Sequence, residues 1–112
     1  MVVPFSPDRG DIIMLDFDPQ QGREQKGRRP AIVLSARSYN VKAGLAVLCP
    51  ITRQVKGYPF EVSLPAFITT KGVILADHIK SLDFRRRNIT FIERVSHEVP
   101  AQVFRKLERL LS

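Results

Sequence analysis

The residues best suited to chemistry stand in one basic loop, residues 22–30, between two apolar runs of the chain. The loop carries one carboxylate, Glu24, among four cations: Arg23, Lys26, Arg28 and Arg29. An arginine guanidinium is planar, permanently charged and able to bind two phosphate oxygens at once. Long loops without apolar anchors are typically functional or disordered, and a strand predicted directly after this loop fixes its far end. We therefore interpret residues 22–30 as a loop that faces an anion.

Arg29, Glu24 and Thr52 are residue types that suit metal-free cleavage of RNA. In RNA the 2′-hydroxyl is an internal nucleophile, so a protein need only remove its proton, stabilise charge on phosphorus and protonate the leaving oxygen. Glu24 could accept the proton, Arg29 could stabilise the charge, and Thr52 could donate a hydrogen bond to a phosphate oxygen. Composition and spacing leave a structural alternative open, because loop charges usually pair or solvate without a catalytic role.

The sequence lacks a complete set of residues for metal-dependent, covalent or nucleotide-dependent catalysis. Two histidines and one cysteine cannot assemble a zinc site. Asp11, Asp16 and Asp18 are spaced like the carboxylates of a magnesium nuclease, but the sequence supplies no obvious further ligand downstream. There is no nucleophile elbow and no glycine-rich phosphate loop opening a helix. We therefore predict no metal and no cofactor.

The composition is that of a small, basic domain. The chain has 112 residues, 44% of them hydrophobic, and a net charge of +7, which predicts a single domain over residues 1–112. Excess positive charge suggests an anionic partner, nucleic acid or an acidic protein segment, although a basic surface can also serve solubility. Cys49 is the only cysteine, and the sequence shows neither a secretion pattern nor an apolar run of membrane length. We expect a cytoplasmic protein without membrane contact.

Short apolar runs with strand-like alternation account for most of the chain. The predicted strands are residues 11–17, 30–34, 44–52, 60–64, 72–76 with its continuation to 82, and 89–95. Residues 35–43 and 65–71 are predicted to be connections. The arginine run of residues 85–87 fits a solvated turn as well as it fits a binding segment.

The tail has a helical period instead. Its apolar residues share one helix face: Val103, Phe104, Leu107, Leu110 and Leu111. Pro100 suits the first turn of this helix, and the proline disfavours helical geometry at Val99. The sequence thus predicts a mainly β protein (α+β), a small antiparallel barrel or curled sheet closed by a C-terminal helix.

Three motifs follow one another in a specific order: G-x-E-Q at residues 22–25, R-P-A-I-V-L-S at residues 29–35 and P-x-T at residues 50–52. Matches at residues 10–19, 56–62 and, more weakly, 76–83 extend the pattern. With these motifs the chain resembles the MazF/PemK family of toxin ribonucleases from type II toxin–antitoxin modules. The resemblance covers most of the chain up to about residue 83.

The resemblance implies an SH3-like antiparallel barrel of the MazF/CcdB type with a C-terminal helix, a homodimer, and an acidic, partly disordered MazE-like antitoxin as partner. It implies sequence-specific, metal-independent cleavage of single-stranded RNA to a 2′,3′-cyclic phosphate, which inhibits translation. Glu24, Arg29 and Thr52 match the family's catalytic residues. The positions that match its RNA contacts are Phe17, Gln25, Lys56, Tyr58 and Lys80. Because arginine keeps its proton in proteins, charge stabilisation by Arg29 with Glu24 as proton acceptor is the easier assignment.

Two other functional classes stay open at this point. CcdB-like gyrase-directed toxins share the fold without nuclease activity, and a barrel that only binds single-stranded RNA could use Phe17, Tyr58 and the basic loop. The sequence also departs from the family pattern. Phe84 stands where tryptophan is frequent, and His78 where an amide is common. These departures concern base preference and antitoxin pairing rather than the chemistry.

Overall fold

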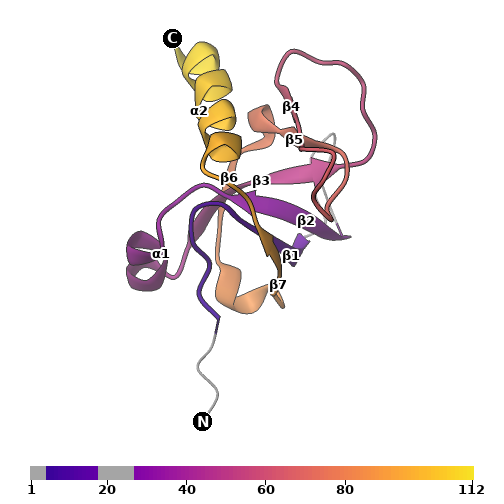
Figure 1. The fold of residues 1–112 in the computed structure, drawn as a ribbon. Coiled ribbons are helices and arrows are strands. Elements are labelled where there is room, and N and C mark those ends of the chain that lie inside the picture. The colour runs from indigo at the N-terminus through magenta and orange to yellow at the C-terminus, as the bar shows by residue number, and fades with distance from the viewer. Residues whose placement is uncertain (1–4, 18–26) are drawn as a thin grey trace.

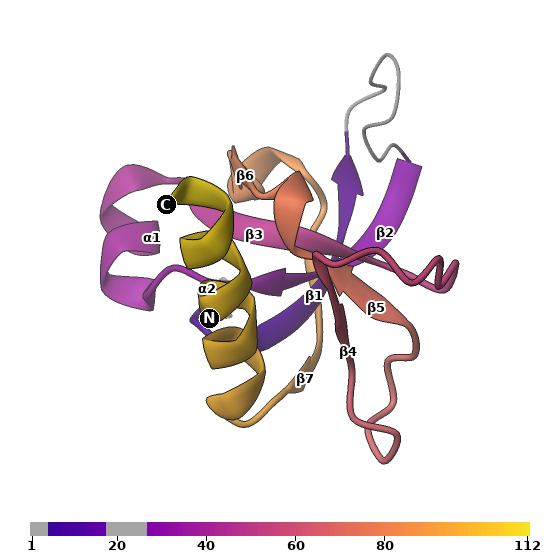
Figure 2. The same cartoon turned by 90° about the horizontal axis from the view of Figure 1, so that it is seen from above.

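The computed structural model describes residues 5–17 and 27–112, which form a strongly curved sheet with one long helix against it (Figures 1 and 2). The strands are β1 (Asp11–Phe17), β2 (Gly27–Val33), β3 (Ala46–Thr52), β4 (Glu61–Ser63), β5 (Val73–Leu75), β6 (Lys80–Leu82) and β7 (Thr90–Arg94). The α-helices are α1 (Arg37–Ala43) and α2 (Glu98–Leu111). Two short 3-10 helices, η1 (Ala76–His78) and η2 (Phe84–Arg86), flank β6.

All strand pairs are antiparallel, in the order β4-β5-β3-β2-β1-β7. Strand β3 is shared between two parts of the sheet. Its first residues, Ala46 to Leu48, pair with β6, whereas Ile51 and Thr52 pair with β5. The prediction of a mainly antiparallel β protein is confirmed. Among the described strands the pairing path ends at β4 and β7, so closure into a barrel stays a prediction.

Two strands contain a proline, which has no backbone N–H to donate, and in each the proline lies where pairing to one neighbouring strand begins or changes. Pro50 falls where β3 changes its partner from β6 to β5, as a strand proline should. The predicted start of the second strand at Pro30 was wrong, because β2 begins at Gly27. Pro30 is tolerated inside β2 because residues 27–30 pair only with β1, and the ladder to β3 begins at Ala31.

Helix α1 occupies the segment predicted to be a connection, and that prediction was wrong. Asn40 is the only residue of α1 that is buried, so the helix lacks the apolar period that would reveal it. The Asn40 side-chain amide donates to the carbonyl oxygens of Pro7 at 2.9 Å and Ser35 at 3.0 Å. Gly44, with φ of 71°, ends the helix in the left-handed conformation, and its N–H donates to the Asn40 carbonyl.

The curved sheet buries an apolar core on each side. One core gathers alternate residues of the first strands, such as Ile12 and Ile32, under α2, whose Val99 and Val103 reach into it. Figure 1 shows α2, in yellow, standing against this part of the sheet. The other core is built from the intervening residues, such as Ile13, together with Phe84. This two-sided burial confirms the interpretation of the first strand as apolar on both faces.

The C-terminal helix was predicted, but its start was placed too late. Helix α2 begins at Glu98, so Pro100 does lie in its first turn, whereas Val99 is helical rather than excluded. The exclusion of Val99 was wrong because its burial, at 4% exposure in the core, outweighs the local preference of a residue before proline. The predicted continuous strand of residues 72–82 is likewise interrupted by η1. Among the described residues, no helix combines the length and apolar character needed to span a membrane.

The arginine run is divided between structural and exposed roles. Arg85 donates to the carbonyl oxygen of Val41 in α1 at 2.7 Å, and Arg87 donates to that of Asp16 in β1 at 3.3 Å. Arg86 points outward, with 88% of its side chain exposed and one ion pair to Asp83. The run therefore ties η2 to two neighbouring elements through Arg85 and Arg87, while Arg86 extends into solvent.

We predict that Asn40→Asp lowers the free energy of unfolding by roughly 2–4 kcal/mol. The change keeps the side chain's shape but removes both donated hydrogen bonds and buries a carboxyl group. Urea unfolding measures the loss. Asn88→Asp is the matched control, because Asn88 is exposed. Equal unfolding midpoints for the two variants would contradict the structural role given to Asn40.

Candidate active site

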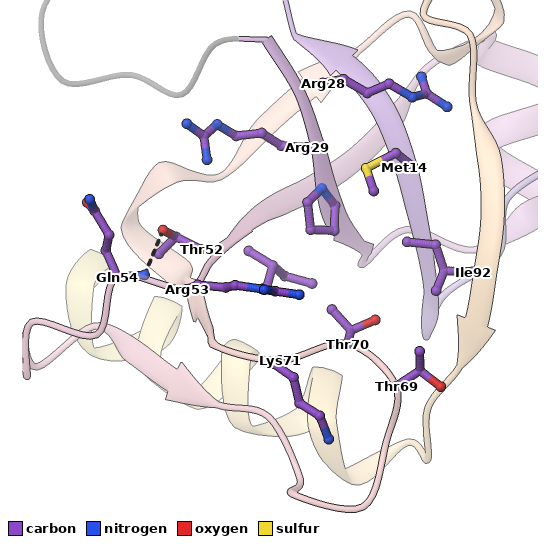
Figure 3. A pocket seen from close by; sticks show the side chains of 12 residues that line it. Met14, Arg28, Arg29, Thr52, Arg53, Gln54, Thr69, Thr70, Lys71 and Ile92 are labelled. Carbon is purple, nitrogen blue, oxygen red and sulfur yellow. Dashed lines mark hydrogen bonds between the residues drawn. The ribbon is translucent and has the colours of Figure 1, made fainter.

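A cationic cavity opens where the pairing of β2 with β3 ends. The ladder between these strands runs Val33–Leu48, Ile32–Cys49 and Ala31–Pro50, and the same register continued by two residues sets Arg29 opposite Thr52. Between the diverging strand ends lies a cavity of about 700 Å³. Its lining comprises Met14, Arg28, Arg29, Pro30, Ile51, Thr52, Arg53, Gln54, Thr69, Thr70, Lys71 and Ile92. Figure 3 shows Arg29 and Thr52 on the same side of this cavity, coming from the two strands.

Two of the cations that line the cavity are held by the protein itself. The Arg28 guanidinium donates to the Asp16 carboxylate at 3.2 Å, the Asn88 carbonyl at 2.7 Å and the Thr90 hydroxyl at 2.9 Å. Lys71 donates from its Nζ atom to the carbonyl oxygens of Ala66 and Ile68. These two cations shape the walls.

Thr52 is fixed from both sides at the end of β3. Its Oγ1 atom accepts a hydrogen bond from the Gln54 backbone N–H at 3.1 Å, which leaves the hydroxyl hydrogen able to donate elsewhere. Gly72, with φ of 116°, packs against its backbone, and a β-carbon there would stand 2.1 Å from the Thr52 carbonyl oxygen. The half-buried threonine is thus held with its hydroxyl at the cavity edge.

A second cavity, of about 630 Å³, adjoins the first through Thr52 and Gln54, which line both. It contains two of the predicted RNA contacts, Lys56 and Tyr58. The Lys56 ammonium lies 5.8 Å from the Tyr58 ring centroid, and the ring is 60% exposed. His78 also lines this cavity, and its buried Nδ1 atom has no hydrogen-bond partner among the described residues.

The other predicted site residues are not gathered at these cavities. Phe17 is 4% exposed and packs in the core beside Leu15, so this conformation does not present its ring to a base. Lys80 lies on β6 and lines neither cavity. Glu24 and Gln25 fall outside the described residues, so the position of the predicted proton acceptor stays a prediction.

No set of three potential metal ligands among histidine, cysteine, aspartate and glutamate occurs within the described ranges. Asp11 pairs with Arg94 at 2.9 Å, and Asp16 with Arg28, while Asp18 falls outside those ranges. Cys49 is fully buried, as predicted. Burial, with a smaller contribution from the Asp77 carboxylate, raises the pKa of its thiol to about 12, so it is no nucleophile.

Comparison of the chain with known proteins identifies its family. The family model described as "PemK-like, MazF-like toxin of type II toxin-antitoxin system" matches residues 8–111. The chain belongs to this toxin family.

Its similarity to individual members is high. The chain is 51% identical over 90 residues to the endoribonuclease toxin MazF of Escherichia coli K12, a match that covers 80% of each chain. It is 30% identical over 109 residues to the Escherichia coli endoribonuclease PemK, covering 94% of this chain and 82% of that one. The crystal structure of MazF from Deinococcus radiodurans superposes with a TM-score of 0.91 at 49% identity, over 96% of this chain and 98% of the other.

Two carboxylates that sequence analysis did not assign hold the walls of the toxin's cavities. Glu61, at the start of β4, accepts hydrogen bonds from the backbone N–H groups of Lys56 and Gly57, each at 3.0 Å. It therefore fixes the turn that carries Lys56 and Tyr58. Glu93 on β7 accepts from the backbone N–H groups of Thr69 and Thr70 and from the Thr70 hydroxyl, which anchors the opposite wall.

The environment of Glu93 lowers its pKa. Burial by itself would raise this pKa, but the hydrogen bonds from Thr70 and Thr69, with the nearby Lys71 charge, outweigh burial. A carboxylate with a lowered pKa stabilises the fold above the ordinary glutamate pKa, and that contribution disappears as pH falls through the folded-state value.

We predict that Gly72→Ala disturbs Thr52 directly. The added β-carbon meets the Thr52 carbonyl, so NMR signals of Thr52 should shift. The free energy of unfolding should fall by about 1–3 kcal/mol more than in Gly57→Ala, from overpacking. Gly57 is the matched control because its φ is also positive, at 78°, and a β-carbon there meets nothing within 4 Å. Unmoved Thr52 signals in Gly72→Ala would contradict this coupling.

We predict a pH-dependent difference in stability between the wild type and Glu93→Gln. The difference should be largest at neutral pH and should shrink below about pH 4.3, the ordinary pKa of glutamate, as the wild-type carboxylate takes up a proton. Thermal unfolding from pH 7 to pH 3 measures it. Glu108→Gln, at an exposed position of α2, controls for the loss of one negative charge. A difference that stays constant with pH would contradict the anchoring role of Glu93.

Proposed function

We propose that this toxin cleaves single-stranded RNA at specific sequences, without a metal ion, and so inhibits translation. As a MazF-type toxin of a toxin–antitoxin system the chain is an endoribonuclease, like the relatives MazF and PemK. One observation supports the chemistry most directly. The β2–β3 register brings Arg29 opposite Thr52 at the edge of a cationic cavity, which is a suitable place for one phosphate group.

In the proposed reaction the ribose 2′-oxygen attacks the adjacent phosphorus atom. The bond from the 2′-oxygen to phosphorus forms while the bond from phosphorus to the 5′-oxygen breaks, which leaves a 2′,3′-cyclic phosphate. Glu24 takes the 2′-hydroxyl proton, and the departing 5′-oxygen takes up a proton from solvent water. Arg29 stabilises the added negative charge on the phosphate, and the Thr52 hydroxyl donates a hydrogen bond to a phosphate oxygen.

The adjoining cavity is proposed to hold a neighbouring nucleotide. Tyr58 offers an exposed ring for base stacking, and Lys56 adds positive charge beside it. Glu61 keeps this turn in one conformation before RNA arrives, which reduces the entropy lost on binding. Phe17 and Lys80, which line neither of the two cavities described above, and Gln25, which lies outside the described residues, are the remaining proposed RNA contacts.

The proposed partners follow from charge and from the structural relatives. Structures of MazE–MazF complexes from Deinococcus radiodurans superpose with TM-scores of 0.83 to 0.87. With a net charge of +7, this toxin is suited to an acidic MazE-like antitoxin that folds onto the cationic cavity and covers it. A homodimer, an SH3-like barrel and a cytoplasmic location belong to the same proposal.

We predict that the wild type cuts a long single-stranded RNA into discrete fragments in excess EDTA, and that Arg29→Ala reduces the rate roughly 100- to 1,000-fold. Mass spectrometry of the fragments should show 2′,3′-cyclic phosphate ends. Arg86→Ala is the matched control, because it removes the same charge from an 88% exposed side chain outside both cavities.

Three results would each change this proposal. RNA that is bound but stays intact with the wild type would indicate a binding protein instead of a nuclease. Cleavage that appears only after magnesium is added would contradict the metal-free mechanism. Equal cleavage rates for Arg29→Ala and Arg86→Ala would show that Arg29 has no role in cleavage.

A further inference from the structure

Arg53 is a cavity-lining cation whose charge the described part of the protein does not use. It follows Thr52 immediately, is exposed and lines the 700 Å³ cavity. Arg28 and Lys71, in the same lining, are held by hydrogen bonds to the walls. By contrast, no hydrogen bond or ion pair engages the Arg53 guanidinium among the described residues. Its charge is therefore available to a ligand.

The position of Arg53 places this charge beside the proposed reaction site. Continuing the β2–β3 register by a third residue sets Arg53 opposite Arg28, one step outward from the Arg29–Thr52 pair. Figure 3 shows the Arg53 side chain extending across the cavity rather than away from it. The wall beyond, residues 69–71, is held by Glu93 and by the Lys71 hydrogen bonds. Arg53 thus extends toward a wall whose backbone is held by hydrogen bonds.

The charge around Arg53 calls for a polyanion rather than a single counter-ion. Arg53 lines the same cavity as Arg29, the proposed contact of the scissile phosphate, and two cations side by side suit two neighbouring phosphates of one strand. The cavity is also much larger than one phosphate group requires, and is comparable to pockets that hold whole small molecules. A single strand of RNA presents one phosphate per nucleotide, so a phosphate bound between Arg29 and Thr52 brings its neighbours close to Arg53.

We propose that Arg53 forms a second phosphate subsite, which binds the phosphate next to the scissile one. This inference rests on the proposed ribonuclease function, since it is the bound scissile phosphate that sets the position of its neighbour. The planar guanidinium binds two oxygens of one phosphate in a bidentate manner, which a lysine cannot reproduce. Arg53 positions the RNA strand; the bond making and breaking stays with the Arg29 and Thr52 site.

Loss of this subsite should weaken RNA binding with little effect on the chemical step. For Arg53→Ala we expect KM to rise roughly tenfold to a hundredfold, the range of one hydrogen-bonded charge contact, while kcat changes little. The slope of log affinity against log salt concentration should become shallower by about 0.7, the value for one phosphate contact to a single strand. Arg53→Lys should keep the slope but recover only part of the KM. Arg86→Ala is the matched control for the loss of one positive charge.

A modified substrate identifies the phosphate. Methylphosphonate, which is neutral, replaces either the linkage before or the linkage after the scissile phosphate of a cleavable oligonucleotide. One of the two replacements should weaken RNA binding by the wild type as much as Arg53→Ala does. The same replacement should not weaken RNA binding by the Arg53→Ala variant any further. Affinity is measured on the same oligonucleotide with a 2′-deoxy sugar at the cleaved nucleotide, which blocks the reaction, so binding is read whether or not the protein cleaves.

The outcomes separate this proposal from the proposed function. If the unmodified RNA is not cut by the wild type, the ribonuclease function fails, while the deoxy oligonucleotide still reports on Arg53. The subsite is wrong if Arg53→Ala binds RNA as Arg86→Ala does, or if both methylphosphonates weaken the variant and the wild type equally. It is also wrong if Arg53→Ala weakens binding only to an acidic antitoxin peptide and leaves RNA affinity unchanged.

Discussion

The end of the ladder between β2 and β3 determines where the cationic cavity of this protein lies. Pro30 and Pro50 stand at that end, and neither can donate a backbone hydrogen bond. Beyond Ala31 and Pro50 no pairing between the two strands continues, and β3 turns to β5 instead. The strands separate, yet the register is still fixed by the paired residues behind them. Arg29 and Thr52 therefore face each other across a gap that the sheet itself defines.

Carboxylates support this gap from outside it. Glu61, Glu93 and Asp16 each hold a backbone turn, a loop or an arginine that borders a cavity. Each of them accepts hydrogen bonds from donors in the walls, and none of the three lines the 700 Å³ cavity, although Glu61 does line the adjoining one. The division has a physical advantage for a protein that binds a polyanion. The acidic groups that hold the walls do not line the 700 Å³ cavity, so the charged side chains in its lining are all cations.

The sequence predicts this fold well where apolar alternation is strong, and less well where polar contacts decide. Residues 11–17 and the helical tail were assigned because their periodicity reflects the two cores. Helix α1 escaped prediction because one asparagine, Asn40, rather than an apolar face, holds it. Thr52 and Arg29 could be paired from motifs. The role of Glu61 could not be predicted from the sequence, because it binds the backbone N–H groups of Lys56 and Gly57, and every residue other than proline has such a group. Arg53 and Arg28 are the same residue type, and only the hydrogen bonds around them distinguish their roles.

The burial of Cys49 in the middle of β3 makes its sulfur a chemical reporter of the sheet. The chain has no tryptophan, so it lacks the usual fluorescent probe of unfolding. Its one thiol is fully buried and stays protonated far above neutral pH. Thiol reagents attack the thiolate, so modification in the native state requires β3 to open. The rate of labelling at Cys49 therefore measures how often β3, the strand that carries Thr52, opens at this position.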